Sequence, residues 1–189
     1  MERDSVPRYR TPMRGYFGIG VERVSKAMNV GNLFRTAHAF GASFVFTVAA
    51  DYSPHRGRSD TSAAPLNIPL YNFAGVEDMD LPHDCELVGI ELLDEAVELP
   101  SFRHPRLAAY VLGPERGALS PALRARCRHV VKIPTAFCVN VGIAGAIVMY
   151  DRMINLGRFA ERPLVPGGEP RPLPDHVHGA PKKRVPKVK

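Results

Sequence analysis

The sequence lacks the features that would take a chain into or across a membrane. No run of about 18 uncharged apolar residues occurs in its 189 residues, so a membrane-spanning helix is not expected. The first ten residues, MERDSVPRYR, contain no apolar stretch, and we expect no signal peptide. Hydrophobic residues make up 45% and charged residues 23%, a globular balance that excludes full disorder, collagen and a coiled coil.

Cysteine is scarce and carries no ligand pattern. The three cysteines, Cys85, Cys127 and Cys138, show no C-x-x-C spacing, which argues against a zinc site or a redox pair. We therefore expect no metal and interpret the three as reduced thiols of a cytoplasmic protein.

The positive charge is concentrated at the two ends of the chain. The net charge is +6, yet residues 15–157 hold 13 Lys or Arg against 14 Asp or Glu. Residues 158–189 hold eight Lys or Arg, three acids and seven of the 18 prolines, which predicts a flexible tail rather than a folded unit. This predicts three parts: a basic extension over 1–14, one domain over 15–157 and a tail over 158–189. The tail is either an arm attracted to phosphate or a solubilising segment.

The folded part alternates strands with helices. A turn is expected at 29–32, and Ser120, Asn140 and Gly157 are expected to begin or end helices. The expected strands are Tyr16–Val24, Phe44–Ala50, Leu87–Leu92, Leu107–Leu112 and His129–Ile133. The expected helices are Leu33–Phe40, Pro121–Arg128 and Asn140–Leu156. This order predicts an α/β fold with a mostly parallel sheet and helices on both faces, with ligands beyond the carboxyl ends of the strands.

Three segments that follow predicted strands carry unusual polar residues and glycines. The first, 29–35, holds Asn29 and Arg35, a guanidinium suited to phosphate or to a surface ion pair. The second, 112–117, holds Glu115 between two glycines, in a shaped loop or an ordinary turn. The third, 133–142, leads through Asn140 into a helix with small residues, for close ligand approach or tight packing.

Together these segments resemble the motifs of the SpoU/TrmH family of RNA ribose methyltransferases, within the SPOUT superfamily. The family's first motif, N-x-G-x-x-x-R-T-A-x-x-F-G, stands here as NVGNLFRTAHAFG at 29–41. The second stands as LGPERGALS at 112–120 and the third as IPTAFCVNVGIAGA at 133–146. Cys138 occupies a position where the family usually has Ser.

The resemblance implies a trefoil knot near the C-terminus, a homodimer, and S-adenosylmethionine bound by the knot loops. It implies a cofactor pocket whose members are Ile90, Gly113, Ile133, Cys138 and Val139. It also implies a catalytic neighbourhood whose members are Arg35, Asn29, Glu115 and Asn140. RNA is the implied substrate, with transfer RNA favoured over ribosomal RNA.

The chemistry and its rivals can be weighed on physical grounds. Ribose methylation needs the 2′-OH aligned with an activated methyl group, and an arginine, always protonated, suits phosphate clamping better than base catalysis. Two basic residues of the loop 51–61, Arg56 and Arg58, either bind RNA backbone or are solvated. A dinucleotide-binding enzyme is disfavoured because no G-x-G-x-x-G follows the first strand. A non-catalytic RNA-binding protein with the same fold stays an alternative.

Overall fold

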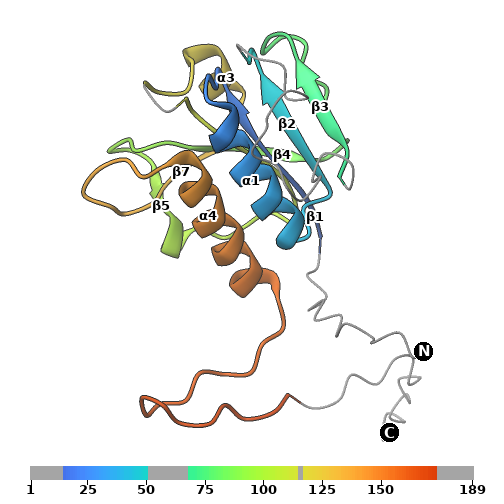
Figure 1. Cartoon of the computed structure of the whole chain (residues 1–189). Coiled ribbons are helices and arrows are strands. Elements are labelled where there is room, and N and C mark those ends of the chain that lie inside the picture. Colours follow the sequence, from blue (N-terminus) through green and yellow to red (C-terminus); the bar gives the residue numbers. More distant parts are fainter. Residues whose placement is uncertain (1–14, 51–67, 115–116, 174–189) are drawn as a thin grey trace, which may run out of the picture. The chain divides into compact units, whose positions relative to one another are not determined.

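A seven-stranded, entirely parallel sheet forms the centre of the structure. The structure is a computed structural model, and it describes residues 15–50, 68–114 and 117–173. The strand order is β3-β2-β1-β6-β4-β7-β5 (Figure 1). The strands are β1 (Tyr16–Glu22), β2 (Phe44–Val48), β3 (Leu70–Phe73), β4 (Glu86–Ile90), β5 (Val97–Glu98), β6 (Leu107–Leu112) and β7 (His129–Lys132). The helices are α1 (Ala27–Ala39), α3 (Pro121–Arg126), α4 (Val141–Leu156) and the 3-10 helix η2 (Leu99–Ser101).

Two apolar cores lie on opposite faces of the sheet, and each has its own helices. On one face α1 and α4 lie side by side and bury Leu33 and Val148 against strand residues such as Ile19 (Figure 1). On the other face α3 buries Leu123 beside Phe46. Successive strand residues point to opposite faces, so the apolar runs fill both cores. The predicted α/β fold with helices on both faces is confirmed.

The expected turn at 29–32 is wrong, because α1 begins at Ala27 and contains this segment. Val30, Leu33, Phe34 and Ala37 are all buried, and their spacing of three and four residues continues one helical face through the segment. Gly31 is therefore a helical residue, and the apolar stripe outweighs its poor helix propensity.

The expected caps of the later helices are present. The Ser120 side chain accepts a hydrogen bond from Leu123 N at 3.2 Å, and the Asn140 side chain accepts one from Gly142 N at 2.9 Å. Gly157 follows the last residue of α4. Each side chain satisfies a backbone N–H that the first helical turn leaves unpaired.

Arg152 fixes the C-terminal half of α4 to the segment before β6. Its guanidinium is buried and donates to the carbonyl oxygens of Pro105 (2.6 Å) and Arg106 (2.8 Å) and to Tyr110 Oη (3.1 Å). It also lies 5.0 Å from the centre of the Phe17 ring. These contacts pair a buried charge with several acceptors and hold α4 in place.

The chain divides into two compact units, residues 1–157 and 158–189. In the second unit the structure describes residues 158–173, which contain no helix or strand. A turn closed by a hydrogen bond from Gly168 N to Val165 O (3.0 Å) interrupts this segment, and Leu164 and Val165 are exposed.

No helix within the described residues is long and apolar enough to span a membrane.

Candidate active site

The carboxyl ends of β6, β4 and β7, three neighbouring strands, surround a cavity of about 110 Å³. Ile90 ends β4, Gly113 follows β6, and Ile133 follows β7. Cys138 and Val139, from the loop before α4, complete the set of five residues expected to hold a cofactor. The structure therefore brings all five to one cavity.

The walls of the cavity combine apolar side chains with a carboxylate. Leu112 and Val141 add to the apolar surface of Ile90, and Glu91 follows β4 directly. A Cβ atom at Gly113 would lie 3.1 Å from Leu119 N, so the chain folds back closely over this strand end. The cavity thus offers apolar walls with polar groups at its edge.

Asn29 and Asn140, two of the predicted catalytic residues, contact each other. Asn140 Nδ2 donates to Asn29 Oδ1 at 3.1 Å, while Asn140 Oδ1 caps α4. This contact joins the first turn of α1 to the start of α4, next to the cavity residues Val139 and Val141.

Arg35 and Glu115 are placed differently from this pair. Arg35 is exposed on α1 and makes no hydrogen bond or ion pair with any other described residue. It is six positions after Asn29, which on an α-helix means about 9 Å along the axis and about 120° around it. Its guanidinium is therefore available to a ligand. Glu115 lies outside the described residues, as do Arg56 and Arg58.

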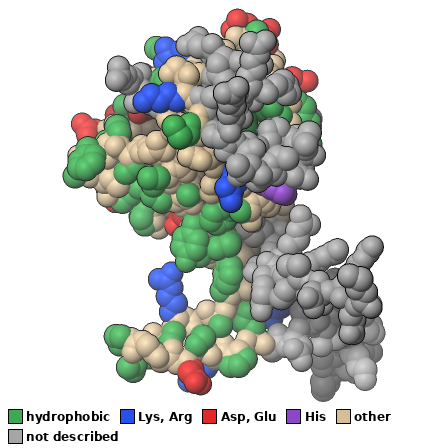
Figure 2. Space-filling model, in the orientation of Figure 1, with side chains coloured by type: hydrophobic (Ala, Val, Ile, Leu, Met, Phe, Trp, Pro, Cys, Tyr) green, Lys and Arg blue, Asp and Glu red, His purple; other side chains and the backbone are tan. Residues whose placement is uncertain are grey.

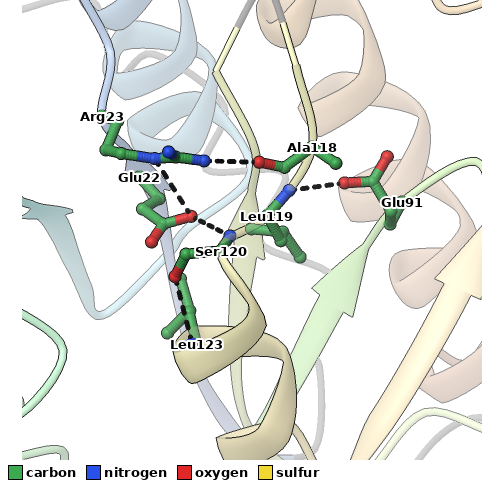
Figure 3. A network of polar contacts seen from close by, with 7 residues as sticks. All are labelled: Glu22, Arg23, Glu91, Ala118, Leu119, Ser120 and Leu123. Carbon is green, nitrogen blue, oxygen red and sulfur yellow. Dashed lines mark hydrogen bonds and ion pairs between the residues drawn. The ribbon is translucent and has the colours of Figure 1, made fainter.

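Two carboxylates that were not among the predicted site residues hold the segment between β6 and α3. Glu22, buried at the end of β1, accepts from Ser120 N at 2.7 Å, and Glu91 accepts from Leu119 N at 2.7 Å. Figure 3 shows the two side chains reaching this segment from opposite sides. The available signal was an acid at the end of each of two apolar strands, but its partner was not visible in the sequence.

Arg23 adds a third contact to the same segment. Its Nη2 donates to Ala118 O at 2.6 Å, and its Nε lies 3.8 Å from Glu22 Oε2 (Figure 3). Charged groups make stronger hydrogen bonds than neutral ones, so these contacts fix the second motif segment firmly beside the cavity.

Among the residues that the structure describes, no three His, Cys, Asp or Glu side chains group closely enough to hold a metal ion.

A family model described as "SpoU rRNA Methylase family" matches residues 17–150. The chain belongs to this family. The SpoU match spans the cavity residues and all of the strands described above except Tyr16, the first residue of β1. No curated protein matches the chain.

Solved structures of methyltransferases share the fold. The SpoU methyltransferase AviRb from Streptomyces viridochromogenes is 25% identical, with a TM-score of 0.65, over 77% of this chain and 62% of AviRb. An AdoMet-bound rRNA methyltransferase from Sinorhizobium meliloti is 22% identical, with a TM-score of 0.68, over 77% of this chain and 58% of its own. AviRb has also been solved with the cofactor AdoMet. This chain spans about three fifths of the length of these two proteins.

A third structure is more similar in size. It was solved to explain "2-OH methylation of C/U34 on tRNA", and it is 21% identical to this chain with a TM-score of 0.64. The alignment covers 78% of this chain and 94% of that protein.

Proposed function

We propose that this protein is an S-adenosylmethionine-dependent RNA 2′-O-ribose methyltransferase. The observation that carries the proposal is the convergence of Ile90, Gly113, Ile133, Cys138 and Val139 on one cavity in a chain of the SpoU family. AviRb and the Sinorhizobium meliloti protein, which share the fold, were both solved with AdoMet.

The cavity has the chemistry that this cofactor needs. Ile90, Leu112, Ile133 and Val139 provide apolar surface against which an adenine ring can pack. Glu91 provides carboxylate oxygens for hydroxyl or ammonium donors at the edge. When bound, S-adenosylmethionine supplies a methyl group already activated by a positively charged sulfur.

We assign the alignment of the ribose and the handling of its proton to the four predicted catalytic residues. Arg35 clamps the phosphate next to the target ribose and stabilises the oxyanion that develops at the 2′ oxygen. A guanidinium keeps its own proton, so the 2′-OH proton passes to phosphate or water. The hydrogen bond from Asn140 to Asn29 holds the start of α4 against α1. Glu115 is the fourth residue of the proposed catalytic set.

The exposed side of α4 supports a homodimer. Ile143, Ile147, Tyr150 and Ile154 follow one another at helical spacing, and all but Ile147 are exposed. Figure 2 shows hydrophobic side chains gathered over the region of α4. A second copy would bury this stripe. Tyr150→Glu should therefore give a monomer in sedimentation, while Val97→Glu, at an exposed position of β5, should leave the dimer intact.

The proposal includes the trefoil knot near the C-terminus. In support of it, β7 lies between β4 and β5 in the sheet, and the chain then passes the cavity to reach α4 beside α1. Pulling the chain from both ends in a force experiment should leave it shorter than its full contour length by the size of a tightened knot. Extension to the full length would exclude the knot.

Transfer RNA in the cytoplasm is the favoured substrate, and ribosomal RNA is the alternative. In support, the chain covers 94% of the protein solved to explain methylation of tRNA but 58% of the Sinorhizobium meliloti rRNA methyltransferase. The three cysteines, all free thiols, suit a reducing compartment.

The deciding experiment compares 2′-O-methyl sites in total RNA from the wild-type organism and a strain without the gene. We expect a site to be missing from the transfer RNA fraction of that strain, and the purified protein with S-adenosylmethionine to restore it. A site missing only from ribosomal RNA would establish the alternative. Tight RNA binding with no site missing or restored would favour a non-catalytic RNA-binding protein.

The role of Arg35 can be tested separately. Arg35→Lys keeps the charge but removes the planar, two-pronged donor, so turnover should fall by at least about tenfold while cofactor binding is retained. Arg124→Lys changes an exposed arginine of α3 and serves as the control. Full turnover by Arg35→Lys would contradict a bidentate role.

A further inference from the structure

Phe137 is the most exposed phenylalanine or tyrosine among the residues that the structure describes, at 75% exposure. A phenylalanine in this position gains only a small part of the free energy that full burial of its ring would provide. It lies between Thr135 and Cys138, which both line the cavity. Its ring is therefore an uncovered apolar surface on the segment that contributes Thr135 and Cys138 to the cavity.

The loop that carries Phe137 is fixed on both sides. Thr135 Oγ1 donates to Phe137 O at 2.9 Å, and Thr135 N donates to Ile133 O at 2.7 Å. Three residues further on, Asn140 caps α4 and donates to Asn29. The exposed ring thus stands on a backbone that is held in place, and little conformational entropy is lost when a ligand packs on it.

Ribose methylation creates a need for such a surface. A ribose within an A-form helix is hard to align with a buried methyl group, so the target nucleotide must leave its stack. Its base is then no longer stacked on its neighbours, and aromatic side chains commonly replace them. Phenylalanine has no hydrogen-bonding group, so it stacks with any base and selects for an unstacked nucleotide rather than for a sequence.

We propose that Phe137 is the platform on which the base of the target nucleotide stacks while its ribose enters the cavity. This inference rests on the proposed methyltransferase function and assigns the site a class of substrate, an unpaired nucleotide turned out of its helix. Phe137 precedes α4 and does not belong to the apolar stripe proposed for the dimer.

The first test compares the kinetics of three variants, with transfer RNA from the deletion strain as substrate. Phe137→Ala should raise the KM for this RNA by about 5- to 150-fold, the range expected for removal of one base–aromatic stack. The affinity for S-adenosylmethionine should not change. Phe137→Tyr and Phe137→Trp keep a ring and should retain a KM within about threefold of the wild-type value.

The second test uses the absence of tryptophan from the chain. Phe137→Trp introduces a single tryptophan, whose fluorescence should be quenched by the same RNA when the base stacks on it. Tyr71→Trp is the matched control, because Tyr71 is a partly exposed aromatic residue (46%) on β3. This strand forms the edge of the sheet that is farther from β7. RNA should leave its fluorescence unchanged.

The outcomes separate this inference from the function on which it rests. If wild-type protein methylates RNA but Phe137→Ala has an unchanged KM, or both tryptophans are quenched equally, the stacking role is wrong. If Phe137→Ala instead converts the dimer to a monomer, the ring belongs to the subunit interface and the inference is also overturned. If wild-type protein restores no methyl group in transfer or ribosomal RNA, the proposed function fails, whatever the tryptophan reports.

Discussion

At the scale of single residues, His104 is a buried group whose protonation opposes folding. Its Nδ1 lies 2.6 Å from Tyr110 Oη and its Nε2 lies 2.9 Å from Asp151 Oδ2. Burial lowers the pKa of His104, the hydrogen bond to Asp151 opposes this effect, and the nearby Arg152 adds to it. The folded protein therefore keeps this imidazole neutral at pH values where the unfolded chain takes up a proton.

The free energy of unfolding should consequently decrease as the pH falls below about 6.5, the ordinary pKa of histidine. The lowered pKa means that the unfolded state binds more protons in this range, so acid favours unfolding. Urea denaturation over a pH series that runs from neutral to mildly acidic measures the effect. His104→Gln should be less stable at neutral pH but should be destabilised less by acidification, and parallel curves for the two proteins would contradict the assignment.

The three cysteines provide a chemical test of the cavity. Cys138 is exposed and lines it, whereas burial raises the pKa of Cys85 and raises that of Cys127 to about 11. Because the thiolate is the reactive form, iodoacetamide at mildly alkaline pH should alkylate Cys138 first and Cys127 slowly.

S-adenosylmethionine should protect Cys138 and leave Cys85 and Cys127 unaffected, as measured by mass spectrometry of the peptides. Cys138→Ser should abolish the fast, protectable reaction. Alkylation of Cys138 at the same rate with and without the cofactor would mean that the cofactor binds elsewhere.

At the scale of elements, the packing of α1 against α4 depends on a close approach at Gly145. A Cβ atom at this position would lie 2.2 Å from Leu33 Cδ1, and Leu33 is fully buried. Gly145→Ala should therefore lower the free energy of unfolding by about 1–3 kcal/mol through overpacking, despite the better helix propensity of alanine.

A double-mutant cycle measured by urea denaturation identifies the cause. In a Leu33→Ala background the space is open, and Gly145→Ala should become neutral or stabilising by about 0.5–1 kcal/mol. An equal decrease of stability in both backgrounds would mean that the contact with Leu33 is not responsible.

Elements with strong local signals were predictable from the sequence, and those that depend on distant partners were not. The bounds of β6 are those predicted, because an apolar run ends at Gly113. Strand β3 consists of half-exposed and exposed residues, and β5 has only two residues. Neither therefore shows the alternation of apolar and polar residues by which a strand is predicted from sequence. Each exists because it pairs with a neighbour, β2 for β3 and β7 for β5.

The same distinction holds for the candidate site. Of the five predicted cavity residues, Gly113, Ile133, Cys138 and Val139 follow strands and lie in family motifs, while Ile90 ends β4. Their convergence was predictable because parallel strands end at one edge of the sheet. The roles of Glu22 and Glu91 were not, since Glu22 reaches Ser120 98 residues further along the chain and Glu91 reaches Leu119 28 residues further along. A pattern of residue types does not specify such side-chain to backbone contacts.

At the scale of the whole molecule, the net positive charge lies outside the part of the chain that holds the candidate site. Residues 15–157 are nearly neutral, while residues 163–189 contain six Lys or Arg and two acids. Removing residues 163–189 should weaken RNA binding and reduce the slope of log K against log salt by about 0.7–0.9 for each phosphate that the protein no longer neutralises. Cofactor affinity should stay the same.

A full-length variant with glutamine in place of the five basic residues of 182–189 separates charge from chain length, and it should reproduce most of the decrease in slope. Filter binding over a series of salt concentrations around the physiological value measures both proteins. An unchanged slope after truncation would show that the basic tail takes no part in RNA binding.

The pairing of β1 with β6 also determines how long one edge of β1 stays unpaired while the chain is being synthesised. About 85 residues separate Glu22, at the end of β1, from Leu107, where β6 begins. At about 5–20 residues per second, the ribosome needs roughly 4–17 seconds to make this stretch. Until then β1, an apolar strand in the interior of the finished sheet, can pair with β2 alone and has one open edge. The newly made chain thus carries an aggregation-prone strand edge for seconds, which is long enough for a chaperone to bind it.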